Sequence, residues 1–190
     1  KELIRTILES RLYQLSSEAN ATNAADTRNF SRSYRRRLRA EVLLDAVGDV
    51  TGVPTSFSAT WNGARALETW NFKIGSEFLD AFGRPNSSSD PPCERNTKGT
   101  VVQALHMMHS EILHTKITHA DGRAAKLTAG DQTPAEIAEE VFLVALNRRP
   151  TASESKEITT YFDRKKNDRA GAVQDLLWAV LNTAEFLFNH

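Results

Sequence analysis

The sequence has little of what builds cross-linked or metal-rich domains, because its 190 residues include a single cysteine, Cys93. One cysteine excludes an internal disulfide framework, a zinc site built from several cysteines and the two-cysteine attachment of a c-type haem within this chain. No apolar run reaches the length of about 18 residues that a membrane-spanning helix needs. We therefore expect no cofactor in this chain and no membrane span.

An excess of charge of one sign is also missing, since 24 Lys and Arg balance 24 Asp and Glu. This balance argues against nucleic acid and anionic lipid as partners. Hydrophobic residues make up 40% and charged residues 25%, a globular composition. The length predicts a single domain spanning residues 1–190, or two packed halves, 1–95 and 96–190. Because the chain starts at Lys1 already in a helical pattern, we expect a fragment of a larger protein.

Apolar residues return at every third or fourth position in most segments, which is the spacing of helices that bury one face. This period predicts helices over residues 3–15, 38–50, 78–82, 101–112, 120–127 and 173–187. The helix from 101 either continues or breaks at Ser110, where the serine would cap a second short helix. Capping boxes begin two more helices, at Thr133 and Thr151. No segment alternates with a period of two, so we predict an all-α fold, a compact multi-helix bundle with long irregular connections.

Two stretches lack a helical period and are expected to connect the helices. Residues 53–66 are rich in Ser, Thr, Pro, Gly and Asn, and a short extended piece is expected at 66–70. Residues 84–92 contain three prolines and three serines, which predicts a long loop. Gly52 is placed to end the helix over 38–50, and Arg148 is placed at the negative end of the helix that begins at Thr133.

Positive charge gathers near the N-terminus, at Arg32, Arg35, Arg36, Arg37 and Arg39. The first 40 residues carry nine positive and four negative side chains. Such a cluster could bind an anion or nucleic acid. The neutral chain favours a structural role instead, in which these arginines pair with Glu41, Asp45 or more distant acids.

His106 and His109 stand three positions apart, a spacing that can place two imidazoles on one metal ion. At about 100° per residue, however, His109 borders the apolar stripe of its helix and His114 faces away from it. The three rings therefore cannot converge, and a site would need Cys93 or an acid from another segment. We predict that no metal is bound and that these histidines belong to an ordinary polar face.

The candidate ligand-binding or catalytic residues are Cys93, Glu94 and Arg95, together with His106. Arg95, or the positive end of the helix that follows, could lower the pKa of the Cys93 thiol. The structural alternative is a loop held by a Glu94–Arg95 pair, with Cys93 as a small buried apolar residue. The sequence contains no glycine-rich phosphate loop, no His-Glu-x-x-His, no Gly-x-Ser-x-Gly and no calcium loop.

Six segments resemble, in order and spacing, the Domain of Unknown Function 1553 family: residues 36–46, 78–85, 93–95, 103–106, 146–151 and 177–187. The resemblance implies a C-terminal part of a large exported planctomycete-type protein that often also carries a cytochrome c-like domain. Any haem would then lie on another domain of the parent protein. Where the family pattern has Cys-x-Cys-Glu-Arg, this chain has Pro91 at the first cysteine. The family provides no established activity or catalytic residue.

Three hypotheses follow from the sequence. The first is a non-catalytic helical interaction or scaffold module, whose partners are other domains of the same polypeptide or a second protein. It predicts exposed apolar surface around residues 3–15 or 186–188. The second is an enzyme or ligand-binding domain, glycans being one candidate ligand class, with its site near Cys93. The third is anion or nucleic-acid binding through residues 32–39.

Overall fold

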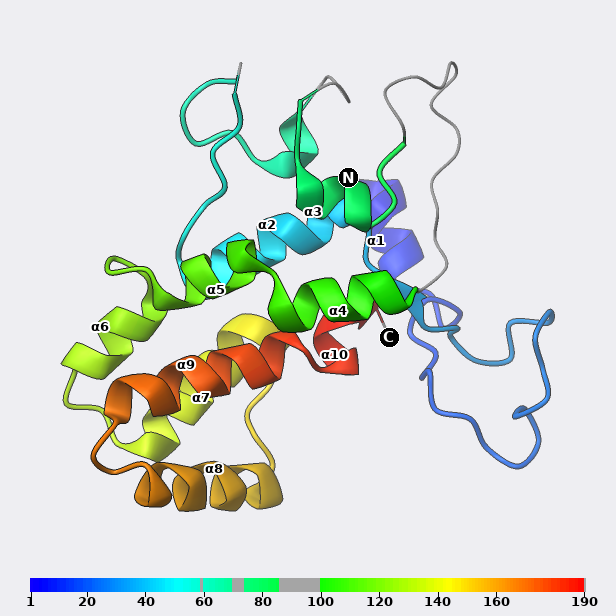
Figure 1. Cartoon of the computed structure of the whole chain (residues 1–190). Helices are drawn as coiled ribbons and strands as arrows, with labels where there is room; N and C mark the ends of the chain where they lie inside the picture. Colours follow the sequence, from blue (N-terminus) through cyan, green and yellow to red (C-terminus); the bar gives the residue numbers. More distant parts are fainter. Residues whose placement is uncertain (59, 70–73, 86–99, 190) are drawn as a thin grey trace.

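The computed structural model describes residues 1–58, 60–69, 74–85 and 100–189, and it is mostly helical, as the sequence predicts (Figure 1). Two antiparallel two-residue strands, β1 and β2, join distant parts of the chain, with Arg37 opposite Phe188. Among the described residues no helix is long and apolar enough to cross a bilayer. In chain order the elements are α1 (Glu2–Glu9), β1 (Arg36–Arg37), α2 (Ala40–Thr51), the 3-10 helix η1 (Ala66–Glu68), α3 (Glu77–Ala81), α4 (Val101–His109), α5 (Glu111–Thr118), α6 (Arg123–Ala129), α7 (Pro134–Leu146), α8 (Ala152–Arg164), α9 (Arg169–Leu181), α10 (Ala184–Leu187) and β2 (Phe188–Asn189).

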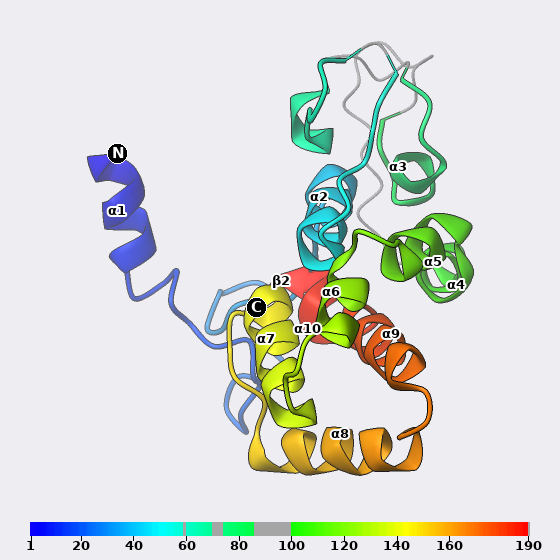
Figure 2. The same ribbon diagram turned by 90° about the vertical axis from the view of Figure 1, so that its left-hand side faces the viewer.

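The core lies where α2, α6, α7 and α9 meet. Both α2 and α9 pack on α6 and on α7, and α8 lies across the end of the α7–α9 pair (Figure 2). Leu43 of α2, Ile137 of α7 and Leu177 of α9 are completely buried at this junction. Burying one such side chain stabilises a fold by about 1.5–3 kcal/mol, so this contact holds the helices together.

Local sequence signals fix most helix ends. In both capping boxes the Thr hydroxyl accepts from the backbone N–H three residues on, and the Glu carboxylate accepts from the Thr N–H at 2.7 Å. Ser110 ends α4 and caps α5 by accepting from Leu113 N–H, so of the two alternatives left open by the sequence the helix breaks here. Gly52 ends α2 with φ of 71°, in the left-handed region that glycine adopts at little cost.

Three predicted elements differ from the structure. The first helix stops at Glu9, because Ser10 Oγ donates to Ile7 O and accepts from Tyr13 N–H in a tight turn. The last predicted helix is split into α9 and α10, since Thr183 Oγ1 begins a new turn by accepting from Phe186 N–H. Residues 66–68 are a 3-10 helix rather than an extended piece, because the Asp45 carboxylate accepts from two successive N–H groups there.

The apolar stripe predicted to be buried on α4 faces outward. Val101 is 76% exposed, and Leu105 and Met108 are about half exposed. The side of α4 that meets α3 carries Met107 and Gln103, whose Nε2 donates to Ala81 O at 3.2 Å. Helical spacing correctly groups residues on one face, but it does not show that this chain covers that face.

The N-terminal arm, residues 1–39, differs from the rest of the molecule. Its helix α1 stands apart from the other helices in Figure 2, and none of its residues is buried. The arm joins the helical body, residues 40–189, through segment 13–18, which lies near α10, and through the β1–β2 pair. The chain therefore consists of a packed helical body and an arm that contacts it at few points.

Candidate functional site

Three features qualify as candidate sites, and the first is a cleft that contains His106. The cleft has a volume of about 590 Å³ and lies between α3, the segment after α2, and the α4–α5 junction. The His106 ring meets Phe78 and Phe82 edge-on, with centroid distances of 5.5 and 5.9 Å. Burial lowers the pKa of His106, and the nearby Glu77 carboxylate opposes this shift. Burial therefore favours the neutral form of the His106 imidazole.

Lys116, which no sequence motif singles out, lines the same cleft. Its side chain is buried, with 6% of the residue exposed, and Nζ donates to Val53 O at 2.5 Å. Burial lowers the pKa of Lys116 to about 8, although Asp45 acts in the opposite direction. The available signal is its position on α5, because residues three and four positions after Leu113, here Lys116 and Ile117, flank its buried face.

The cleft also contains polar groups whose hydrogen-bonding capacity is unused. His106 Nε2 and Thr55 Oγ1 are buried without a hydrogen-bond partner among the described residues. Each such group costs about 1–3 kcal/mol relative to a satisfied one. Cys93, Glu94 and Arg95 lie outside the described residues, so their placement beside His106 stays a prediction.

The other histidines of this region do not join His106. His109 and His114 are exposed. Because the apolar stripe that His109 borders is itself exposed, the expectation that this stripe places His109 at the edge of the core is wrong. The reason is the orientation of α4, which turns its Met107 side, and not its Val101–Met108 stripe, toward α3. In the part of the chain that the structure describes, no three His, Cys, Asp or Glu side chains gather closely enough to hold a metal ion.

The structure separates the arginines of the predicted anion-binding set. Arg37 turns into the body, where Nη2 donates to Phe82 O at 2.9 Å and burial lowers its pKa. Arg36 belongs to strand β1, and Arg39 is the exposed residue that precedes α2. Asp45, one of their expected partners, forms an ion pair with Arg65 at 3.5 Å.

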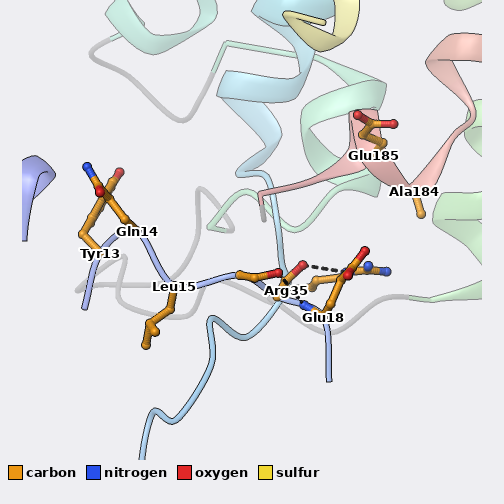
Figure 3. Close-up of a pocket in the computed structure, with 9 residues that line it drawn as sticks. Tyr13, Gln14, Leu15, Glu18, Arg35, Ala184 and Glu185 are labelled. Carbon is orange, nitrogen blue, oxygen red and sulfur yellow. Dashed lines mark hydrogen bonds between the residues drawn. The ribbon is translucent and has the colours of Figure 1, made fainter. Parts of the chain in front are cut away.

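The second candidate site is a hollow that contains Arg32 and Arg35. Arg35 Nε donates to Ser17 Oγ and Arg32 Nη1 donates to Ser17 O, each at 3.3 Å, so both guanidinium groups meet one residue. The hollow has a volume of about 710 Å³. Ser17, Glu18 and Arg35 also line a neighbouring hollow of about 540 Å³, which Figure 3 shows between segment 13–18 and α10.

The third candidate site is the apolar face of α1. At about 100° per residue, Leu3, Ile4, Ile7 and Leu8 fall within an arc of about 140°, opposite the polar residues. The exposed fractions of these four side chains range from 44% to 72%. Leu12, in the turn after the helix, is also exposed. The predicted apolar surface around residues 3–15 is therefore present, whereas Phe186 is buried in the body.

These features define a mostly helical protein with a packed body and an N-terminal arm that exposes an apolar helix face. The family model of PSD1, a protein of unknown function (DUF1553), matches residues 1–162, so the chain belongs to this family and the resemblance is confirmed. The match includes the whole arm and most of the body. No curated protein and no solved structure matches the chain.

Proposed function

We propose that this chain is a non-catalytic helical interaction module of a larger exported protein, and that α1 docks its apolar face in an apolar groove of another folded domain. The observation that carries the proposal is the unpartnered face of α1, where four large aliphatic side chains are exposed on one side of an eight-residue helix. The family resemblance supports the exported, multidomain parent.

The length of α1 is the second support. Isolated helices shorter than about 12–15 residues are marginal in water, because few hydrogen bonds offset the cost of nucleation. Helices of this size depend on packing one apolar face, and α1 has no buried residue in this chain. A groove on another domain would supply that packing.

The charge of the arm indicates what surrounds the groove. The first 40 residues carry nine positive and four negative side chains, and the remaining residues carry 15 and 20. Complementary charge steers association and selects among partners. Six of the nine positive side chains lie at residues 28–39, outside α1, so the proposed partner combines an apolar groove for α1 with acidic residues that face this later part of the arm.

Exposure of the apolar face of α1 is tested first, with the purified chain. The double variant Ile4→Glu/Ile7→Glu should lose most of the fluorescence of a bound apolar dye, because it places two charges on the apolar arc. The control Arg5→Glu/Thr6→Glu places two negative charges on the opposite side of the helix and should retain the signal. Equal fluorescence from both variants would show that the dye binds elsewhere.

Docking of α1 is tested by placing a photo-crosslinking residue at position 4 or at position 6 of the chain, expressed in the organism that naturally produces it. Position 4 should crosslink to one protein surface, and excess wild-type chain should suppress the product while the Ile4→Glu/Ile7→Glu chain should not. Position 6 should give little product. Crosslinking that is equal at both positions, or that neither chain suppresses, would contradict docking through this face.

A further inference from the structure

The arginines of the body and of the arm are treated differently by the fold. In the body, Arg65, Arg84, Arg123, Arg148 and Arg149 each pair with a carboxylate at 2.6–2.9 Å. Arg32 and Arg35 form no ion pair with a carboxylate anywhere in the described part of the chain. A guanidinium group has five N–H donors in a planar fork that matches carboxylate, phosphate and sulfate oxygens.

Both of these side chains are positioned by Ser17 and not by an acid. Arg35 is held there through Nε, which leaves the two Nη groups of its fork available for a ligand. Arg32 is held through Nη1, and its Cζ lies 5.3 Å from the centre of the Tyr34 ring. Its Nε is buried and has no partner within the described ranges. Because this Nε does not face the hollow, the donors available there are Arg32 Nη2 and the two Nη groups of Arg35.

From this geometry we infer that Arg32 and Arg35 form a binding site for a tetrahedral oxyanion, a phosphate or sulfate group, in the hollow they share with Ser17 and Tyr34. Two cations and one acid, Glu18, face the hollow, so its net positive charge favours an anionic ligand. A tetrahedral group also offers enough oxygens to engage both forks, whereas a carboxylate has two.

This site differs from the predicted one in its members. Arg37 is turned toward Phe82, and Arg36 and Arg39 do not line the hollow, so only Arg32 and Arg35 of the predicted cluster remain. It is also separate from the apolar face of α1. Substitutions in one should leave the other unchanged.

The test is a titration of the full chain with inorganic phosphate at constant ionic strength, followed through the Nε–Hε resonances of arginine and, in every variant, through the backbone amide resonances of Ser17 and Tyr34, which line the hollow. Wild-type protein should show saturable shifts for Arg32 and Arg35. The Arg32→Gln/Arg35→Gln variant should bind at least about 10-fold more weakly, since each lost charge-assisted contact contributes strongly. Arg11→Gln/Arg28→Gln removes the same charge from the arm outside the hollow and should bind as wild type does.

Three further measurements complete the test. Inorganic sulfate should bind with an affinity similar to that of phosphate, and acetate should bind more weakly. Arg35→Lys keeps the charge but loses the fork, so it should weaken phosphate binding several-fold while the far-UV circular dichroism stays unchanged. Equal weakening in the Arg11→Gln/Arg28→Gln control, acetate binding as tight as phosphate binding, or the absence of saturation would each overturn the inference.

Discussion

The arm and the body place the same residue types in opposite situations. In the body, aliphatic side chains are buried at the α2, α6, α7 and α9 junction, and arginines meet carboxylates of the same chain. In the arm, the aliphatic side chains of α1 are exposed, and Arg32 and Arg35 meet no acid within the described residues. The body buries most of its large aliphatic side chains and pairs several of its arginines, although α4 exposes Val101, and His106 Nε2 has no partner within the described ranges. The arm exposes its apolar helix face and leaves Arg32 and Arg35 without an acid among the described residues, so it is the part of the chain that we expect to bind another molecule.

The largest expected effect comes from truncating a leucine in each region. Leu177→Ala, at a fully buried position of α9, should reduce the free energy of unfolding by about 2–5 kcal/mol, through lost burial and the cavity left behind. Leu3→Ala, at a position of α1 that is 72% exposed, should change it by less than about 0.5 kcal/mol. Urea denaturation followed by circular dichroism measures both, and losses of equal size would remove the distinction between arm and body.

The buried amine of Lys116 should make the body's stability depend on alkaline pH. Its folded pKa of about 8 lies below the ordinary value of 10.5, so between these pH values the unfolded state binds more protons than the folded state. The free energy of unfolding of wild type should therefore rise from pH 8 to above pH 10, by at most about 3 kcal/mol, relative to a Lys116→Met variant. Lys126→Met, at an exposed position of α6, should show no such difference. A pH-independent difference between wild type and Lys116→Met would contradict this.

A smaller effect is expected at the ion-pair cluster that joins α7, α8 and α10. Arg148 binds Glu154 with two hydrogen bonds of 2.9 Å and Glu185 with two of 2.7 Å, beside the Phe142 ring. Arg148→Gln should destabilise the body by about 2 kcal/mol, because both carboxylates lose charge-assisted partners. Arg149→Gln breaks an exposed pair with Glu139 and should cost about 0–1 kcal/mol.

The same cluster gives an acid signature with a defined sign. Hydrogen bonds from Arg148 lower the pKa of Glu154 to about 2, below the ordinary 4.5. The stability that this pair contributes is present above pH 4.5 and is lost as the pH falls toward 2. The Arg148→Gln variant should lose less stability than wild type over this range. An equal loss in both proteins would show that other groups control the acid transition.

Much of the body could be predicted from the sequence because its signals are local. The capping boxes at Thr133 and Thr151 and the glycine at position 52 act within one turn of helix, so they fix helix ends wherever the helix packs. The split at Thr183 and the 3-10 helix at residues 66–68 were missed. The 3-10 helix depends on the Asp45 carboxylate, 21 residues away in the sequence, and the spacing of apolar residues carries no information about so distant a contact.

The candidate sites were less predictable, since they depend on which side of an element the rest of the chain covers. The apolar stripe of α4 and the apolar face of α1 look alike in sequence to any buried helix face. His106 was assigned to a polar face, although two phenylalanines of α3 and its following turn enclose it. The arginine cluster is evident in the sequence, but only the structure shows that Arg37 turns inward while Arg32 and Arg35 share one hollow.

The smallest expected effect comes from removing residues 1–9, and it separates the two parts of the arm. Since α1 has no buried residue, the deletion should change the free energy of unfolding by less than about 0.5 kcal/mol. The shifts of Arg32 and Arg35 on phosphate addition should also persist, because their contacts are with Ser17 and Tyr34. A loss of more than about 1 kcal/mol would show that α1 packs against its own body in solution, since substitutions at exposed sites rarely cost that much. In that case the exposed face of α1 would no longer require a partner, and the contrast between arm and body would rest on the arginines alone.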